Sequence, residues 1–542
     1  MKKWRINLIF IFIILFGAVL LGRLVYIQII QGDLYRALAF GQQKDFQPSV
    51  GERGEIFFSG GEILAANVKG SYIFLCPDKI EEKEKTAQKL SEILRVEKEF
   101  ILEKINRDSL FEKITTELTK ETEEIIKELA LPGVFINEAV FRKYPQEEMA
   151  SQTIGFFGGD EQGQYGLEGF YDDILQGEEE FQKKADNGAD IFLSLNYNLQ
   201  FMAEKLLREA KDNLNIESGQ IIVAEPNTGR ILALADFPNF NPNHYSEIED
   251  FQVFQNGAHQ KLFEPGSAFK PITLAAAIDE GKIAPDDIFD DQGKVKIGQY
   301  TIYNYNKRVW GERTMTEILE KSINTGAVFV EKKLGHNNFL KYTEKFGFFE
   351  PTKIDLQGEV FSENKEFRKG YEINFATASF GQGIEITPIQ LIRAFCAIAN
   401  GGKLVKLHLA EKIVKGGEII YSFSGQGDQV ISLKTASQIG AMLISVVENG
   451  FARAAKIDGY YIAGKTGTAQ IPWTTLGINK KGYSDKTWQS FIGFFPAFSP
   501  RFLVLIKLDN PETRTAEYSA VPVFKKMAKY IIDYYQIPPD HE

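Results

Sequence analysis

The chain has 542 residues, too many for one ordinary hydrophobic core, so two or more domains are expected. Its composition, 44% hydrophobic and 25% charged, is that of a globular protein, and no internal repeat or low-complexity tract stands out. The net charge of −11 argues against nucleic acid as a partner.

The residue types that hold metals and cofactors show no organised pattern. The two cysteines, Cys76 and Cys396, fall in different predicted domains, which favours two buried free thiols over a disulfide or a metal site. The five histidines are scattered without paired spacing. The sequence therefore predicts no metal and no other cofactor.

The N-terminus begins with three basic residues within residues 1–5, followed by an apolar run over residues 6–30. A helix of about 20 residues spans the roughly 30 Å hydrocarbon core, so this run is long enough to cross a membrane with some tilt. A cleaved signal peptide is the alternative, but its apolar core is shorter and no small-x-small cleavage site follows. The basic residues predict an uncleaved anchor with residues 1–5 inside the cell and everything after the span outside.

Residues 31–188 are predicted to form a first, mixed α/β body. Two short strands are expected on either side of the Gly60-Gly61 turn. Residues 83–130 are charged and helical in period, which is typical of a solvated face, so they indicate no function. A turn-rich stretch over residues 163–177 leads out of this body.

Residues 189–542 are predicted to form a second body. Its expected elements are a helix at 195–213, strands at 220–225 and 230–236, a mainly helical middle, strands at 460–470, 489–495 and 502–509, and a helix at 520–535. The first two strands are joined by Pro226-Asn227-Thr228-Gly229, a hairpin signal. Strands at both ends with helices between them predict an antiparallel sheet covered by helices, an α+β fold.

Three short strings in the second body carry chemistry. They are Ser267-Ala268-Phe269-Lys270, Ser322-Ile323-Asn324 and Lys465-Thr466-Gly467. Each string alone is weak evidence for a catalytic site. Ser362 with Lys365 fits the Ser-x-x-Lys pattern equally well, and Ser194 with Asn196 fits Ser-x-Asn. Context separates them, because Ser267 opens an apolar helical run whereas Ser362 lies in a charged loop. Lys-Thr-Gly occurs only once.

The first string fits a serine nucleophile with its own base. A serine hydroxyl attacks well only when a nearby base takes its proton. Ser267 and Lys270 are three residues apart at the start of a helix, so they project from the same face. A lysine can act as the base if burial or a like charge lowers its pKa, and Lys465 is a candidate for that like charge.

The other two strings fit substrate handling. Ser322 and Asn324 follow a helix that a Thr314–Glu317 capping box is expected to begin, and their loop can present a hydroxyl and an amide to one cleft. Ser322 is a candidate proton relay, and Asn324 a candidate partner of the substrate amide and of Lys270. In the third string, small residues let a peptide pair along the strand edge. Thr466 and Thr468 offer hydroxyls to a terminal carboxylate.

An ordinary structural explanation exists for each string by itself. Ser267 fits a helix cap, Lys270 a solvated lysine, and the Ser322–Asn324 string a turn between helices. For an isolated motif that explanation is the better one. Three strings in order and in context favour catalysis.

The ordered set resembles that of the penicillin-recognising serine acyltransferases, and the chain as a whole resembles the class B penicillin-binding proteins. Further strings similar to that family are Arg53-Gly54-Glu55-Ile56, Gly166-Leu167-Glu168, Val223 to Ala233, Phe240-Asn241-Pro242-Asn243, Phe380 to Ile384 and Thr387 to Leu391. One departure is Phe58-Ser59, where the family's pedestal motif usually has Asp-Arg. That puts a local polar contact of the pedestal in doubt.

The resemblance implies a fold and an activity. Residues 31–188 would be a pedestal or dimerisation domain, and residues 189–542 a transpeptidase domain of the penicillin-binding and serine β-lactamase fold. The donor would be a peptidoglycan stem peptide ending in D-Ala-D-Ala, which acylates Ser267 with loss of D-Ala, and a second stem peptide's amine would resolve the ester. By resemblance, the N–H groups of Ser267 and Thr468 would form the oxyanion hole, with Gly467 in the substrate-binding strand.

The resemblance also implies partners and a location. β-Lactams would acylate Ser267, and a polytopic membrane glycosyltransferase would polymerise glycan, since the first body has no motif for it. The chain would be a single-pass protein of the bacterial cytoplasmic membrane with its catalytic domain on the outer face. Glu264-Pro265-Gly266 and Asn324 favour the division type.

Four other functions remain open at this point. A β-lactamase of one common class needs a Glu-x-x-x-Asn string, which is missing between Asn324 and Lys465. A D,D-carboxypeptidase differs only in using water as acceptor. A β-lactam sensor would need a signalling segment, for which Met1 to Arg5 is far too short. A scaffold with a dead site is disfavoured by the intact strings.

Overall fold

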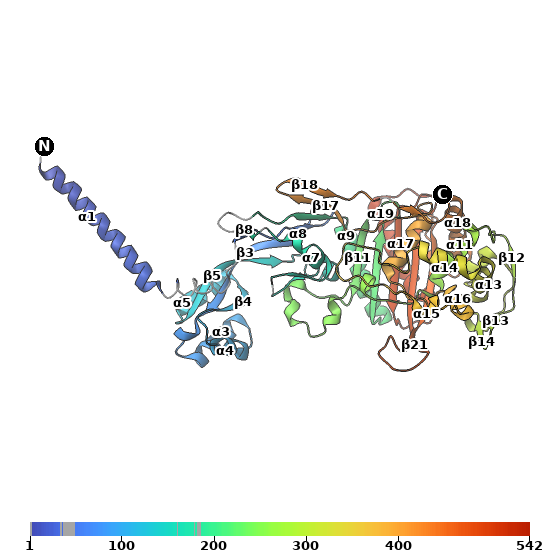
Figure 1. The fold of residues 1–542 in the computed structure, drawn as a ribbon, viewed down its shortest axis with the longest axis horizontal. Helices are drawn as coiled ribbons and strands as arrows, with labels where there is room; N and C mark the ends of the chain where they lie inside the picture. The colour runs from blue at the N-terminus through green and yellow to red at the C-terminus, as the bar shows by residue number, and fades with distance from the viewer. Residues whose placement is uncertain are drawn as a thin grey trace. The chain divides into compact units, whose positions relative to one another are not determined.

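A computed structural model describes residues 3–32, 35, 49–159, 161–177, 179–180, 186–425 and 427–541. The chain divides into two compact units (Figure 1). Unit 1 comprises residues 1–53, 67–143 and 176–188, and unit 2 comprises residues 54–66, 144–175 and 189–542.

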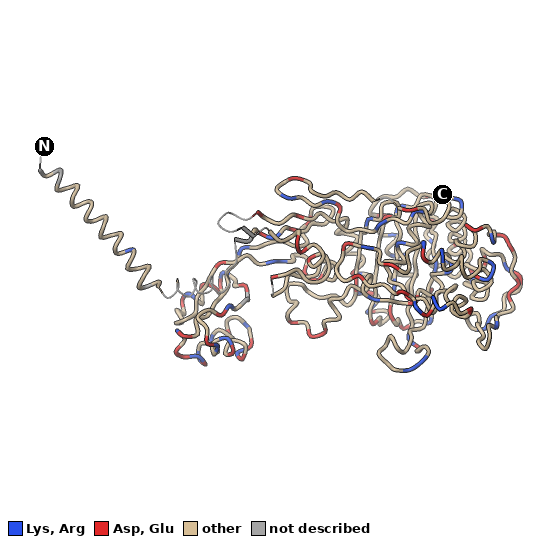
Figure 2. Tube along the Cα trace, viewed as in Figure 1, with Lys and Arg blue, Asp and Glu red and all other residues tan. Residues whose placement is uncertain are grey.

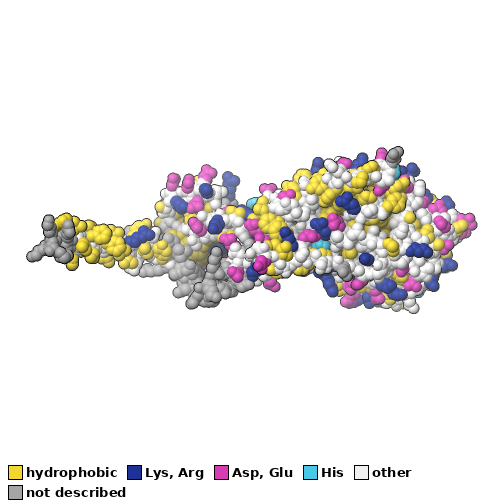
Figure 3. Space-filling model, turned by 90° about the horizontal axis from the view of Figure 1, so that it is seen from above, with side chains coloured by type: hydrophobic (Ala, Val, Ile, Leu, Met, Phe, Trp, Pro, Cys, Tyr) yellow, Lys and Arg dark blue, Asp and Glu magenta, His cyan; other side chains and the backbone are white. Residues whose placement is uncertain are grey.

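The predicted apolar helix is present as α1 (Lys3–Val25), which continues as a π-helical turn, Tyr26–Ile30. The segment Asn7–Ile29 is long and apolar enough to cross a membrane, and it is the one helix of this kind among the described residues. Figure 2 shows almost no charged residue along it, and Figure 3 shows the hydrophobic side chains on its surface. Such a helix satisfies its backbone internally, as a lipid environment requires.

The rest of unit 1 is a small α/β body. Its elements are β1 (Ser49–Val50), the main part of β3 (Ile63–Leu75), α3 (Lys83–Leu94), α4 (Lys98–Ile105), β4 (Glu112–Leu118), α5 (Lys120–Leu129), β5 (Val134–Lys143) and β8 (Glu179–Glu180). Strand β3 pairs with both β4 and β5, and α3 and α4 pack their apolar faces on its core through Leu90 and Ile101.

The helical prediction for residues 83–130 is wrong over β4. This strand pairs antiparallel with β3, and its Ile114 lies opposite Ile73 in the buried core. Burial at Glu112, Ile114 and Leu118 follows the two-residue period of a strand. The charged residues around it hid that period in the sequence.

Unit 2 contains the expected antiparallel sheet, in the order β11-β10-β22-β21-β20. These strands are β10 (Ser218–Ala224), β11 (Ile231–Phe237), β20 (Ala463–Pro472), β21 (Tyr483–Phe495) and β22 (Phe502–Asp509). All four neighbouring pairs run antiparallel. The predicted α+β class and the five strands are confirmed, and β20 lies at one edge of the sheet.

Two groups of helices cover this sheet. The larger helices are α9 (Tyr197–Leu214), α11 (Lys270–Asp279), α12 (Met315–Glu320), α13 (Asn324–Leu334), α14 (His336–Lys345), α16 (Glu372–Ala378), α17 (Pro388–Ala399), α18 (Leu433–Asn449) and α19 (Ala520–Tyr535). One group consists of α9 and α19, which contact one another. In the other group, α18 contacts both α11 and α17. Both groups contact the sheet. Central strand β22 is buried from Phe502 to Leu508, which requires cover on both faces.

The remaining elements of unit 2 are short. They are β2 (Ile56–Phe57), α6 (Ser151–Ile154), β6 (Phe156–Phe157), β7 (Gly163–Gln164), α7 (Gly166–Phe170), α8 (Asp172–Leu175), β9 (Asp190–Leu193), α10 (Gly257–Gln260), β12 (Ile288–Asp291), β13 (Lys294–Ile297), β14 (Tyr300–Tyr303), β15 (Gly311–Thr314), α15 (Lys365–Arg368), β16 (Lys403–Leu404), β17 (Ala410–Lys415), β18 (Glu418–Ser422) and β19 (Asp428–Gln429). Part of the predicted turn-rich stretch, residues 163–177, is thus helical.

The departure at Phe58-Ser59 has a simple structural outcome. The Phe58 ring is fully buried and meets the Tyr197 ring edge-on, with 5.5 Å between centroids. The Ser59 N–H donates to the Leu195 carbonyl oxygen at 2.8 Å. An apolar contact therefore occupies this position of unit 2. Both cysteines are buried thiols outside any disulfide, as predicted.

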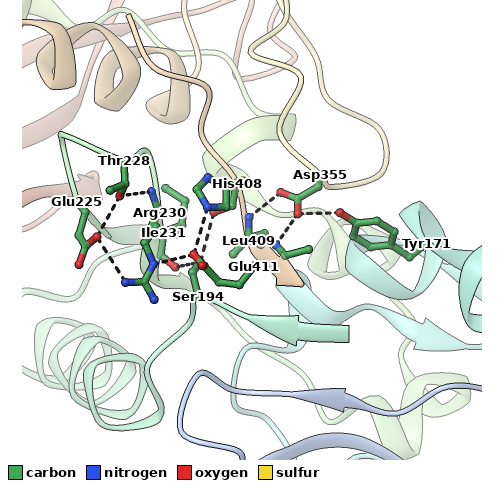
Figure 4. Close-up of polar contacts among 11 residues, drawn as sticks. Tyr171, Ser194, Glu225, Thr228, Arg230, Ile231, Asp355, His408, Leu409 and Glu411 are labelled. Atoms are coloured by element: carbon green, nitrogen blue, oxygen red, sulfur yellow. Dashed lines mark hydrogen bonds and ion pairs between the residues drawn. The ribbon is translucent and has the colours of Figure 1, made fainter. Parts of the chain in front are cut away.

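Asp355 holds several segments of unit 2 together (Figure 4). This carboxylate accepts hydrogen bonds from the N–H groups of Leu409 (2.7 Å) and Ala410 (2.6 Å) and from the Tyr171 hydroxyl (3.0 Å). Nearby, Arg230 binds Glu411 with 2.6 Å between Nε and Oε1. Asp355 is buried, so each donor depends on it for a partner.

Replacing Asp355 by Ala is expected to lower the free energy of unfolding by about 3 kcal/mol, because three buried donors lose their acceptor. Urea unfolding of the full-length chain in detergent measures this loss. Asp286→Ala, at an exposed carboxylate, is the control and should change stability by less than about 0.5 kcal/mol. Equal effects of the two variants would show that the Asp355 contacts stabilise nothing.

Candidate active site

Ser267 lies in a tight turn that its glycine neighbour makes possible. The turn is a 3₁₀ helix, Gly266–Phe269, which runs directly into α11. Gly266 has a φ of +53°, and a Cβ there would lie 2.7 Å from the Thr468 carbonyl oxygen. Only glycine fits such a left-handed and crowded position. In this turn the Gly266 N–H donates to the Gly381 carbonyl oxygen at 3.0 Å and the Ala268 N–H to the Pro265 carbonyl oxygen at 3.3 Å, so the backbone on both sides of Ser267 is held in place.

Lys270 lies at the centre of the site. Its side chain is fully buried, and its Nζ lies 3.0 Å from Ser267 Oγ, 2.6 Å from the Ser322 carbonyl oxygen, 3.2 Å from Ser322 Oγ and 2.8 Å from Asn324 Oδ1. Burial, and secondly the charge of Lys465, hold the pKa of Lys270 well below its usual range. The neutral amine is therefore favoured far more than in an exposed lysine.

The hydrogen bonds around Lys270 decide which partner can donate a hydrogen to the lone pair of its amine. A neutral amine has two hydrogens and one lone pair. The Ser322 carbonyl oxygen can only accept, and Asn324 Oδ1 is held in place because the same amide donates from Nδ2 to the Tyr303 carbonyl oxygen at 3.1 Å. These two acceptors take both hydrogens. The lone pair then remains for a hydroxyl, and Ser267 is the nearer one.

Ser322 and Asn324 occupy the predicted loop between two helices. Helix α12 begins with the expected capping box, in which Thr314 and Glu317 bond reciprocally, and α13 begins at Asn324. Ser322 has a φ of +52°, a left-handed conformation that costs a non-glycine residue roughly 1 kcal/mol. This backbone turns both its carbonyl oxygen and its hydroxyl toward Lys270. Strain at such a position is typical of functional sites.

Lys465 reaches the same cluster from edge strand β20. Its Nζ donates to Ser322 Oγ at 3.1 Å, and burial lowers its pKa to about 7. Thr466 and Thr468 are the half-exposed residues on either side of buried Gly467. A Cβ at Gly467 would lie 2.7 Å from the Pro265 carbonyl oxygen, so a glycine is needed for the strand to approach the turn that bears Ser267.

The structure brings all three strings together in one site. Ser267, Lys270, Ser322, Asn324 and Lys465 form one connected set of polar contacts, with Thr466, Gly467 and Thr468 on the adjoining strand. The two decoy strings lie elsewhere. The Lys365 ammonium is 80% exposed and pairs with Glu363, and Ser194 Oγ donates to a backbone carbonyl 2.7 Å away.

Three features of this site were not predicted from the sequence: the partner that orients Asn324, the backbone of Ser322 and the burial of Glu264, which entered only through a string that favours the division type. The Tyr303 carbonyl orients Asn324 from a separate hairpin, and Ser322 is left-handed although nothing in its sequence indicates it. Glu264 is buried next to the nucleophile turn. Its place as the one charged residue between Leu262 and Phe269 was the one available signal.

Comparisons with known proteins agree on one family. Residues 219–529 match the model of the penicillin binding protein transpeptidase domain, and residues 48–191 match the penicillin-binding protein dimerisation domain. Stage V sporulation protein D of Bacillus subtilis is 33% identical over 536 residues, covering 93% of this chain and 81% of that protein. The peptidoglycan D,D-transpeptidase FtsI of Buchnera aphidicola is 29% identical over 567 residues, covering 99% and 96%.

A solved structure gives the same result. Penicillin binding protein 3 of Mycobacterium tuberculosis, complexed with aztreonam, superposes with a TM-score of 0.72 at 25% identity, over 91% of this chain and 98% of that one. The chain therefore belongs to the penicillin-binding protein family, as a class B member with a dimerisation and a transpeptidase domain. Its enzyme class is peptidoglycan D,D-transpeptidase.

The low pKa of Lys465 makes a prediction about stability. Unfolding exposes this lysine, whose pKa then returns to about 10.4, so between pH 7 and that value the unfolded state binds more protons. Stability contributed at this site is therefore lower at pH 7 and rises with pH. The difference in unfolding free energy between the wild type and Lys465→Met should grow in favour of the wild type by up to about 1.4 kcal/mol per pH unit.

Urea unfolding of both proteins at pH 7.5, 8.5 and 9.5 measures that slope. Lys365→Met, at the exposed lysine of the decoy string, is the matched control and should give a flat difference. A flat difference for Lys465→Met as well would mean that the buried lysine keeps an ordinary pKa.

Proposed function

We propose that Ser267 is the nucleophile of peptidoglycan cross-linking and that Lys270 is its general base. Ser267 Oγ attacks the carbonyl carbon of the penultimate D-Ala of a stem peptide, and its proton passes to the Lys270 lone pair. The C–N bond to the terminal D-Ala breaks, and the proton leaves with that amine. The product is an ester between the donor peptide and Ser267.

Ser322 has a place in the proton path. Its hydroxyl lies 3.2 Å from Lys270 Nζ and 3.1 Å from Lys465 Nζ, so it can carry the proton from Lys270 toward the leaving amine. In the second half-reaction an amine of a neighbouring stem peptide attacks the ester. Its proton returns by the same groups to Ser267 Oγ, and the cross-link is released.

Substrate recognition falls to β20 in this proposal. An edge strand can pair with an extended peptide, and Lys465 in its charged form, with the hydroxyls of Thr466 and Thr468, suits a terminal carboxylate. The N–H groups of Ser267 and Thr468 would stabilise the oxyanion. The closeness of Gly266 to the Thr468 backbone supports this pairing.

One observation carries the proposal. The Lys270 amine contacts the nucleophile of its own string and both polar residues of the second string, while Lys465 of the third contacts Ser322. A buried amine placed this way serves as a base better than as a structural ion. β-Lactams, whose strained amide presents the same carbonyl and carboxylate, would acylate Ser267 and block the site.

The surroundings of the enzyme follow from its anchor. We infer that α1 is an uncleaved membrane span with the N-terminus inside, so that both units lie on the outer face of the cytoplasmic membrane, where peptidoglycan is built. Neither matched domain polymerises glycan, so a polytopic membrane glycosyltransferase is the proposed partner. The relative named FtsI supports a role in division.

Incubation with benzylpenicillin tests the nucleophile. The intact mass of the full-length chain in detergent should increase by one adduct, and Ser267→Ala should show none. Ser362→Ala, in the decoy string, is the matched control and should be acylated like the wild type. An adduct that persists in Ser267→Ala would overturn the assignment.

The acceptor is tested separately with a synthetic D-Ala-D-Ala stem peptide. Transpeptidation predicts a dimeric product when a second amine-bearing stem peptide is supplied. Release of D-Ala without any dimer would favour a D,D-carboxypeptidase. Rapid loss of benzylpenicillin without an adduct would favour a hydrolase. Neither an adduct nor turnover in folded protein would favour a scaffold or an enzyme that needs its partner.

A further inference from the structure

Glu264 is a buried acid that the proposed chemistry leaves without a role. It lies three residues before Ser267, and its side chain is about 95% shielded from solvent. Burying a carboxyl group lowers the stability of the folded protein unless hydrogen bonds compensate for its lost hydration. The contacts of Glu264 therefore need an explanation.

The nucleophile turn is held between two stretches of backbone. On one side, Gly266 packs against Thr468 of β20. On the other, Phe263 and Ile386 exchange two backbone hydrogen bonds of 2.9 and 3.0 Å, and the Gly266 N–H donates to the Gly381 carbonyl oxygen at 3.0 Å. A Cβ at Gly381 would lie 2.1 Å from the Gly266 carbonyl oxygen, so this contact leaves no free space.

Glu264 adds the side-chain link between these parts. Its Oε1 accepts from the Gly383 N–H at 3.1 Å, and the Tyr483 hydroxyl lies 3.1 and 3.2 Å from its two carboxyl oxygens. Tyr483 begins β21 and stands opposite Pro472 of β20. One side chain thus ties the turn that bears Ser267 to the Gly381–Gly383 loop and to the strand pair that bears Lys465.

The charged groups around Glu264 favour its neutral form. Burial, and in addition the nearby charge of Glu385, raise the pKa of Glu264 to about 7. Glu264 also borders a cavity of about 590 Å³ whose other charged residues are Glu363, Lys365, Glu366 and Glu385. Three of these four are acidic. A neutral carboxyl group can both donate and accept, so it suits a hydroxyl and an N–H as partners.

We propose that Glu264 is a positioning residue that fixes the nucleophile turn by bonding to Gly383 and Tyr483. It acts through Ser267 and does not touch the substrate. The inference rests on the proposed role of Ser267 as nucleophile. Because a displacement of about 1 Å in a reacting group can cost 100-fold in rate, a clamp three residues away is enough to matter.

The test is the rate of acylation by a fluorescent penicillin, measured by stopped flow on the full-length chain in detergent. Glu264→Ala should lower the limiting acylation rate constant by about 10- to 100-fold, with the half-saturating drug concentration little changed. Glu264→Gln should restore most of that rate, since an amide can still bond to both Gly383 and Tyr483. Glu363→Ala, at an exposed acid of the same cavity, should match the wild type.

Several outcomes are separable. The final amount of bound drug reports the folded fraction of each variant, so a loss of folding lowers this amount and not the rate constant. An unchanged rate constant in Glu264→Ala, or a Glu264→Gln variant as slow as Glu264→Ala, would overturn the positioning role. If the wild type itself is not acylated at Ser267, the proposed function fails first and the inference with it.

Discussion

The site depends on one constraint, which is that the Lys270 amine is buried where a charge is costly. Burial disfavours the ammonium form, and the Lys465 ammonium opposes it further. Satisfying this amine requires acceptors, and the chain supplies them from another helix pair, through the Ser322 carbonyl and the Asn324 amide. The left-handed Ser322, the start of α13 and the hairpin carbonyl of Tyr303 are all consequences of that requirement.

The glycines of the site allow its backbone segments to pack closely around Ser267. Gly266 in the turn that bears Ser267, together with Gly381 and Gly467, lets two other backbone segments approach that turn more closely than any side chain would permit. The sheet edge can therefore lie beside Ser267, and Lys465 can reach Ser322. A peptide that extends β20 would lie beside Ser267, Lys270 and Lys465, the residues to which we assign the chemistry.

The three strings of the candidate site could be recognised in the sequence because their spacing along helices and strands is local. Ser267 and Lys270 share one helical face, and the capping box at Thr314 marks the helix before Ser322. The antiparallel sheet was predictable from its long apolar strands. Strand β4 was not, because its buried residues alternate with charged ones inside a stretch of helical period. Contacts between distant segments, such as Tyr303 with Asn324 or Tyr483 with Glu264, leave no local pattern to find.

The most direct test of this account is the pKa of Lys270 itself. The chain labelled with ¹³C at lysine Cε can be titrated by NMR, with the Lys270 signal assigned from its loss in Lys270→Arg. The account predicts that the transition from ammonium to neutral amine falls far below the usual lysine value of about 10.4. An ammonium shift at pH 7, with a transition near the usual value of about 10.4, would contradict the proposed base.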